Sequence, residues 1–280
     1  MGKHDVKLSL QGLSARHATA RRGAADALAD LQLDIAEGEQ IAVIGPSGAG
    51  KTTLLEVLAC ARPPSAGALR VDGVDPWALP GRALRRLRGR LILLPQVPPL
   101  PPRQRVVTAV LAGRLPAWGL GKALRSLVYP VDIPAAEAAL TVFDLADKLF
   151  ERVDRLSGGE RQRVGLARAL VAPARLWLVD EPLSALDPAR AGRAVEALRR
   201  EAAARGVTLV ATLHQVEAAL AHFPRIVGLR DGRLVFDLPA AEVTPERLAR
   251  LYAQHEDELH GAAPLDEPPA APLPVAMQCR

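Results

Sequence analysis

One short segment of this chain constrains its fold more than any other. Residues 45–52 read GPSGAGKT and fit the pattern G-x-x-x-x-G-K-[ST]. The segment follows an apolar run at 40–44, which predicts a buried strand, and it precedes a helix-like stretch that begins at Lys51. Strand, glycine-rich turn and helix in this order are typical of a loop that wraps phosphate groups. The segment therefore predicts an α/β chain that binds a nucleoside triphosphate.

The chemistry of phosphate binding gives each residue type in this loop a task. Glycines let backbone N–H groups turn inward, and the N-terminus of the following helix adds partial positive charge. We expect Lys51 to reach the β- and γ-phosphates of ATP and the Thr52 hydroxyl to bind Mg²⁺. The ATP-binding residues predicted in this segment are Gly45, Pro46, Ser47, Gly48, Ala49, Gly50, Lys51, Thr52 and Thr53.

A second apolar run, at 175–179, ends in a pair of acids. Asp180 suits the coordination shell of Mg²⁺, and Glu181 would stand where a general base polarises an attacking water. Two acids at the end of a strand are often no more than a solvated turn. The phosphate-binding loop earlier in the chain makes the catalytic interpretation the stronger one.

The segment LSGGER at 156–161 answers no evident need of the fold. Two glycines after Ser157, at the start of an Arg-rich helix, would form a second nest of N–H groups for an anion. A helix that Ser157 simply caps is the alternative interpretation.

The order of these segments carries a family resemblance. GPSGAGKT at 45–52 is followed by Gln96 at the end of a predicted strand, then by LSGGE, LVDEP and SALD, and last by His214 at the end of another strand. This series resembles the nucleotide-binding subunit of ABC transporters over about residues 5–252. The resemblance implies the ABC cassette of the P-loop NTPases, with ATP and Mg²⁺ as its cofactors.

The resemblance also implies a role for each matching residue. Glu181 and His214 would be catalytic, with His214 contacting the γ-phosphate, and Asp187 would lie in a loop at the dimer interface. Gln96 would contact ATP, Mg²⁺ and water and sense the membrane subunits. The implied metal ligands are Thr52, Gln96 and Asp180. The implied signature, which would cap ATP held by a second copy, is Ser157, Gly158, Gly159 and Glu160.

The same resemblance and the run of elements predict the domain organisation. Alternating apolar runs and helical stretches indicate a parallel-sheet core. We expect a cassette at 5–252 with an antiparallel β-subdomain, which includes a hairpin at 67–75, and an inserted helical subdomain at about 97–165. A second hairpin is expected at 226–236. The proline-rich, acidic residues 256–280 are predicted to be a disordered tail.

Charge and cysteine content narrow the function classes further. The chain carries a net charge of +5 with a pI near 9.7, and residues 256–280 contribute −4 of it. A basic body admits nucleic acid or an anionic membrane as a partner. The motifs assign that charge to ATP phosphates and a membrane-bound partner, so we expect no nucleic-acid partner. Cys60 and Cys279 are too few and too far apart for a disulfide framework or a metal site, which favours a reducing compartment.

A finer resemblance concerns the transported substrate. Three segments look like the phosphonate importer ATPases: TLHQVEAAL at 212–220, RIVGLRDGRLVFD at 225–237 and VLAGRLPAW at 110–118. As in those proteins, a glutamine, Gln215, follows the switch histidine, which is His214 here. The implied function is ATP hydrolysis that energises uptake of a phosphonate or a related phosphorus oxyanion. Importers of phosphate, phosphite or another small anion, and more remotely an ABC ATPase outside transport, are the alternatives.

The implied partners follow from what the sequence lacks. No uncharged apolar run approaches the roughly 18–20 residues that span a bilayer, so separate permease subunits would supply the membrane spans. The implied assembly contains a second copy of this chain and the permease, with a periplasmic substrate-binding protein as an indirect partner. The expected location is the cytoplasmic face of the bacterial inner membrane, where the chain is peripheral.

One departure from the family and one aromatic residue are singled out. The family usually stacks adenine on an aromatic side chain before the first core strand, but no aromatic residue precedes Trp77. By position, His17 or Arg16 would stand there. The region around Trp118 is predicted to dock a cytoplasmic helix of the permease, although a core or anchoring role for Trp118 is the alternative.

Overall fold

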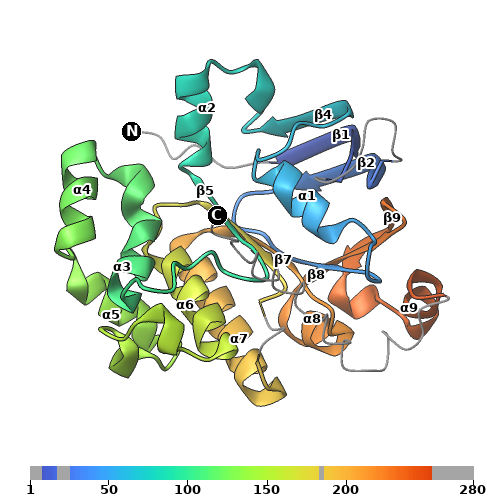
Figure 1. Ribbon diagram of the computed structural model, residues 1–280. Helices are drawn as coiled ribbons and strands as arrows, with labels where there is room; N and C mark the ends of the chain where they lie inside the picture. The colour runs from blue at the N-terminus through green and yellow to red at the C-terminus, as the bar shows by residue number, and fades with distance from the viewer. Residues whose placement is uncertain (1–7, 18–25, 183–185, 254–280) are drawn as a thin grey trace, which may run out of the picture.

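The computed structural model describes residues 8–17, 26–182 and 186–253. The predicted tail at 256–280 and Ser184 and Ala185 of the SALD segment lie outside the described residues. Two sheets and a set of helices make up the described chain (Figure 1). The strands are β1 (Leu8–Ala15), β2 (Leu28–Ile35), β3 (Gln40–Ile44), β4 (Ala66–Val71), β5 (Leu91–Leu94), β6 (Leu176–Asp180), β7 (Thr208–Thr212), β8 (Arg225–Arg230) and β9 (Arg233–Pro239).

The larger sheet has the strand order β5-β6-β7-β3-β8-β9. Its first five strands run parallel, and β9 pairs antiparallel with β8. Every residue of β3, β6 and β7 is buried. Strands buried on both faces need an unbroken apolar run, which is why these segments were legible in the sequence.

The smaller sheet has the order β2-β1-β4 and is antiparallel throughout. The antiparallel β-subdomain is thus present, and so is the turn predicted at Asp72 and Gly73, but the hairpin expected at 67–75 has no second strand. β4 ends at Val71, and after the turn at Asp72 and Gly73 only Val74 pairs back, as a single bridge. Asp75 then accepts a hydrogen bond from the Trp77 N–H and begins a short 3₁₀ turn, so β4 takes its ladder from β1 instead.

The helices are unevenly distributed around the sheets. They are α1 (Lys51–Leu58), α2 (Gly81–Arg88), α3 (Val106–Leu111), α4 (Leu120–Val128), α5 (Ile133–Thr141), α6 (Gly158–Val171), α7 (Pro188–Arg205), α8 (Val216–His222) and α9 (Pro245–Leu251). In Figure 1, α3, α4 and α5 gather on the left of the view, far from β1, β2 and β4 at the upper right. None of the described helices is long and apolar enough to cross a membrane.

Two hydrophobic cores lie on opposite faces of the larger sheet. The alternation of side chains along each strand sends Trp177 and Val179 of β6 into a core with α3 and α5 to α9. Leu176 and Leu178 of the same strand enter the other core, which α1 and the antiparallel sheet complete. The parallel strands thereby point their carboxyl ends at one edge, where loops after β3, β6 and β7 can meet.

Candidate nucleotide-hydrolysis site

The loop between β3 and α1 folds in a way that only glycine permits at two positions. Gly45 has φ +153°, and a Cβ placed there would stand 1.9 Å from the carbonyl oxygen of Leu229. Gly50 has φ +99°, and its Cβ would stand 2.5 Å from the carbonyl oxygen of Ala27. The loop is therefore held against neighbouring backbone on both sides, which fixes its curvature.

Lys51 lies at the centre of this loop. Its side chain is buried, and its Nζ donates hydrogen bonds to the carbonyl oxygens of Gly45 at 2.8 Å and Pro46 at 3.1 Å. The N-cap of α1 is Gly50, which supplies no side-chain cap, and the first turn of α1 contains no acid. The helix N-terminus thus joins a buried ammonium group in a cradle whose net character is positive, which fits a polyphosphate.

Asp180, the last residue of β6, connects the loop to the neighbouring strands. Its Oδ2 accepts a hydrogen bond of 2.8 Å from the Thr52 hydroxyl, and its Oδ1 accepts one of 2.6 Å from the Thr212 hydroxyl. Burial raises the pKa of Asp180 above its ordinary value, while the two hydroxyls and Lys51 act in the opposite direction. Thr52 and Asp180 thus present a set of oxygen donors beside the phosphate cradle, and hard oxygen donors are what Mg²⁺ prefers.

Glu181 follows in a strained conformation that its neighbours hold. Its φ of +47° is unusual for a residue with a side chain. Its N–H lies 3.0 Å from the Thr212 hydroxyl and 3.2 Å from the Thr212 carbonyl oxygen, and its own carbonyl accepts a 2.8 Å bond from the Gln162 amide. The His214 Nε2 contacts the Glu181 Oε1 directly. Lys51, Thr52, Asp180, Glu181 and His214, widely separated in sequence, are therefore brought into one site.

Two polar residues of this site were not predicted from the sequence. Thr212 bonds to both Asp180 and Glu181, and Gln162 holds the backbone of Glu181; both side chains are buried. The two threonines, Thr208 and Thr212, inside the mainly apolar run VTLVATL were the available signal for Thr212. No comparable signal pointed to Gln162, because polar residues are common throughout the helix that carries it.

The remaining predicted residues lie outside this cluster. Gln96 is exposed and stands two residues after the end of β5, the strand next to β6. Asp187 is exposed and caps α7. Its carboxylate accepts a hydrogen bond from the Arg190 N–H, and this bond lowers the pKa of the carboxyl. Among the described residues, no hydrogen bond joins either side chain to the phosphate-binding loop.

The segment 157–160 forms the N-terminus of α6, with Ser157 and Gly158 exposed and Gly159 and Glu160 half-buried. The Ser157 Oγ accepts from the Glu160 N–H at 3.3 Å, and the Glu160 carboxylate accepts from the Ser157 N–H at 2.8 Å. This second bond is the main reason that the pKa of Glu160 is lowered. The reciprocal pair is a capping box, so the sequence-based alternative of a helix cap at Ser157 is present in the structure. The N–H groups of Gly158 and Gly159 are not part of that box.

The base of the loop between β1 and β2 lies beside the phosphate cradle. The Ala27 N–H donates to the Ala15 carbonyl oxygen at 2.8 Å, which places Arg16 next to the residues that abut Gly50. The Arg16 guanidinium is half exposed and pairs with Asp26 at 3.4 Å. Arg16 is thus one of the two residues that the sequence offered in place of an aromatic, and it lies near the residues that abut Gly50.

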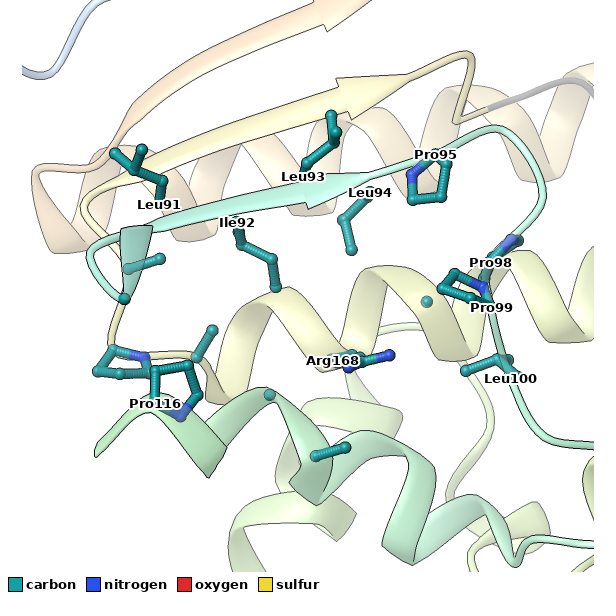
Figure 2. A pocket seen from close by; sticks show the side chains of 17 residues that line it. Leu91, Ile92, Leu93, Leu94, Pro95, Pro98, Pro99, Leu100, Pro116 and Arg168 are labelled. Carbon is teal, nitrogen blue, oxygen red and sulfur yellow. The ribbon is translucent and has the colours of Figure 1, made fainter. Parts of the chain in front are cut away.

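A separate apolar groove runs along β5, the edge strand of the larger sheet. It encloses about 160 Å³ between β5, the prolines that follow it, the 3₁₀ turn at Ala112–Ala117 and α6. Figure 2 shows Ile92 and Leu94 directed from β5 toward the helix, with Pro116 near one end and Pro98 near the other. Arg168 is the one basic side chain among the groove-lining residues, and burial lowers its pKa.

Comparison with known proteins gives this arrangement a family. Residues 28–184 match the model of the ABC transporter family. Phosphonates import ATP-binding protein PhnC 2 of Albidiferax ferrireducens is 66% identical over 98% of this chain and 100% of its own length. The PhnC protein of Polaromonas sp. is 65% identical over the same shares.

Solved structures support the same placement. A bacterial Atm1-family ABC exporter with ATP bound superposes with a TM-score of 0.71 at 26% identity, over 91% of this chain and 42% of the exporter chain. A dimer of the ATP-binding cassette MJ0796 with ADP and Pi superposes with a TM-score of 0.69 at 25% identity, over 83% of this chain and 98% of that one. The predicted cassette fold is confirmed, and the chain belongs to the ABC transporter family, among its phosphonates import ATP-binding proteins.

Proposed function

We propose that this chain hydrolyses ATP to energise phosphonate import through separate permease subunits, on the cytoplasmic face of the inner membrane. The observation that carries the proposal is the continuous chain of contacts from Thr52 through Asp180 and Thr212 to Glu181 and His214, beside a phosphate cradle. The names of its relatives, each a phosphonates import ATP-binding protein, supply the substrate class.

Each residue of the contact chain has a distinct task in hydrolysis. The backbone of 45–50 and the Lys51 ammonium bind the phosphates, while the Glu181 carboxylate accepts a proton from the attacking water. His214 contacts that carboxylate through its Nε2 and would orient it, and as the family's switch histidine it would also contact the γ-phosphate. When bound by Thr52, Asp180 and Gln96, Mg²⁺ neutralises charge on the phosphate oxygens.

A second copy of the chain completes the site. The segment 157–160 makes no hydrogen bond to the described phosphate-binding loop of its own chain, and the N–H groups of Gly158 and Gly159 lie outside the capping box. These donors would close over the γ-phosphate held by the partner, with Asp187 in the interface. Catalysis then consists mainly of positioning and charge stabilisation.

The groove along β5 suits a permease segment. Its walls are leucine, isoleucine and proline, and Arg168 adds one cation that has no described ion-pair partner. A short apolar helix that carries one acidic side chain fits that composition. Trp118 lies two residues after Pro116, at the end of the groove, and its side chain is partly buried against the core. We therefore give it an anchoring role in addition to the docking role.

The domain organisation is part of the same proposal. Residues 5–252 would form the cassette, and about 97–165 the helical subdomain that carries one wall of the groove and the segment 157–160. Movement of that subdomain on ATP binding would then couple closure of the dimer to the permease. A periplasmic binding protein and the permease would select the phosphonate, because the described site binds only the nucleotide.

Growth on a phosphonate as sole phosphorus source tests the function. A strain that lacks this gene should fail to grow on methylphosphonate, and the wild-type gene should restore growth. Glu181→Gln should not restore it, whereas the matched surface substitution Glu196→Gln on α7 should. Normal phosphonate uptake in the deletion strain, together with loss of uptake of another anion, would overturn the substrate class and leave the ATPase assignment intact.

A further inference from the structure

The charge of this chain is concentrated in one stretch. From Pro76 to Val131 the sequence contains no Asp or Glu, while the whole chain has a net charge of only +5. The stretch covers α2, β5, α3 and α4, the elements around the groove. Its basic residues are Arg82, Arg85, Arg86, Arg88, Arg90, Arg103, Arg105, Arg114, Lys122 and Arg125.

The fold uses some of these side chains internally. Arg90 pairs with Asp72, and Arg114 pairs with Asp132. Arg88 donates to the Cys60 carbonyl oxygen, and Arg105 donates to the Phe150 carbonyl oxygen. These four side chains stabilise the chain itself and are not available to a partner.

Two helices hold basic side chains that form no ion pair or hydrogen bond with another element of the described fold; Arg85 Nε donates only to the Gly81 carbonyl oxygen of its own helix, at 3.4 Å. Arg82, Arg85 and Arg86 on α2 and Lys122 and Arg125 on α4 are exposed, and none of the five forms an ion pair with a described acid. We call these five residues the basic rim. Like charges so close together repel one another, and an anionic partner relieves that repulsion.

Apolar side chains stand among the cations on α4. Leu120 is 77% exposed and Leu124 is 57% exposed, one helical turn apart, and Tyr129 just beyond the helix is 66% exposed. Lys122 lies 5.1 Å from the ring centre of Trp118. Leucine, tryptophan and tyrosine beside lysine and arginine are typical of a helix that lies at the surface of a bilayer.

The basic rim flanks the groove proposed for the permease. α2 ends at Arg88, and a Cβ on the next residue, Gly89, would stand 3.3 Å from Pro116. Both residues line the groove, and α4 begins shortly after Pro116. In Figure 1, α2 lies above β5 and α4 lies to its left.

We propose that the basic rim binds anionic lipid headgroups of the membrane that holds the permease. This inference rests on the proposed function for the position of the membrane. Phosphate-bearing headgroups match the five cations, and the interfacial layer accepts Leu120, Leu124 and Tyr129, which a nucleic acid would leave in water. Each basic side chain near such a surface strengthens binding about fivefold.

Vesicle binding by the full-length chain tests the inference. The probes are vesicles of pure phosphatidylcholine and of phosphatidylcholine with phosphatidylglycerol at about three parts in ten. The chain should partition at least tenfold more strongly onto the anionic vesicles, and the difference should vanish as salt rises toward about 1 M. Equal partition onto both vesicles would overturn the proposal, as would displacement of the chain from anionic vesicles by duplex DNA at equal charge concentration.

Two variants locate the binding surface. The triple substitution Arg82→Gln, Arg85→Gln and Arg86→Gln should lower partition at least tenfold, and Leu120→Ser with Leu124→Ser should lower it severalfold. The matched control replaces Arg193, Arg200 and Arg233 by Gln, three exposed arginines without a described ion pair. An equal loss in the control would overturn the proposal. ATP hydrolysis by the triple variant should equal that of the wild type, so loss of vesicle binding is distinguishable from failure of the ATPase assignment.

Discussion

Two helices of this chain, α1 and α6, begin with glycine-containing segments that we propose bind phosphate, and their N-termini differ in side-chain capping. α1 begins after Gly50 with no side-chain cap and no acid in its first turn, and Lys51 is buried behind it. α6 begins at an exposed Ser157 whose hydroxyl, together with Glu160, already satisfies part of the helix end. The side-chain cap is thus absent from one N-terminus, which leaves it open for an anion, and present at the other, which it partly fills.

This difference in capping predicts different roles for the two N-termini in binding ATP. The N-terminus of α1 has a buried ammonium group and no acid in its first turn, so we expect it to bind nucleotide without a second chain. The N-terminus of α6 is stable in water because of its own cap, and only two glycine N–H groups remain for an anion. The structure therefore predicts that nucleotide affinity depends on α1, whereas α6 contributes only when two chains close over ATP.

Glu181→Gln gives the largest expected effect and separates binding from chemistry. The amide cannot accept the water proton, so kcat for ATP hydrolysis should fall by about 10²- to 10⁴-fold, while ATP affinity stays near that of the wild type. The variant should accumulate as an ATP-bound dimer, in which the segment 157–160 is no longer exposed. Phosphate release and size-exclusion chromatography with ATP measure the two effects; near-normal turnover would refute the general-base role.

Lys51→Ala and Ser157→Ala compare the two segments directly. Loss of the buried ammonium should weaken ATP binding by at least about a hundredfold, since hydrogen bonds to charged phosphate oxygens are lost in a buried site. Ser157→Ala should leave binding of ATP to the monomer unchanged and impair ATP-dependent dimerisation. Titration calorimetry at low protein concentration, with Lys148→Ala as the control, tests the contrast. Equal losses in both variants would break it.

The sequence predicted the parts of this site that depend on unbroken patterns. β3 was expected at 40–44 and occurs at Gln40–Ile44, since a strand buried on both faces is a near-continuous apolar run. Asp180 ends β6, Glu181 follows it, and His214 stands two residues after the end of β7, so their convergence at one sheet edge followed from topology alone. The turn of 226–236 at Asp231 and Gly232 is likewise local, and the predicted hairpin there is confirmed.

What the sequence could not show depends on contacts between distant residues. β4 pairs with β1, more than fifty positions away, and the turn at Asp72 and Gly73 carried no sign of that choice. The hydrogen bond from the Gln162 amide to the Glu181 carbonyl oxygen joins α6 to the end of β6, and neither residue type indicates such a bond in the sequence. The basic rim is another case, because its significance lies in which arginines the fold leaves unpaired.

The capping box of α6 should make a smaller, measurable contribution to stability. Ser157→Ala removes the cap and should cost about 1 kcal/mol of the free energy of unfolding, which lowers Tm by roughly 2–4 °C in a chain of this size. The pKa of Glu160 is lowered in the folded chain. Its carboxylate therefore stabilises the fold at pH values above its pKa in the unfolded chain, and this contribution is lost as pH falls through its pKa in the folded chain. Thermal melts of wild type and Glu160→Gln should therefore converge in acid, and a constant gap across pH would contradict the capping role.

Asp180→Asn should produce the smallest shift in stability, and of the opposite sign. Burial raises the pKa of Asp180, so the folded chain binds a proton more tightly than the unfolded chain. The ionised carboxylate therefore costs stability at neutral pH, and this cost disappears below the ordinary aspartate pKa of about 3.9. An asparagine keeps hydrogen-bonding partners for Thr52 and Thr212 without the buried charge. The variant should melt slightly higher than the wild type at pH 7 and equally at low pH, while losing ATP hydrolysis. A lower melting temperature at pH 7 would mean that the positive charge of Lys51 already compensates for burial of the Asp180 carboxylate. The charges at the start of α1 would then be balanced even before phosphate binds.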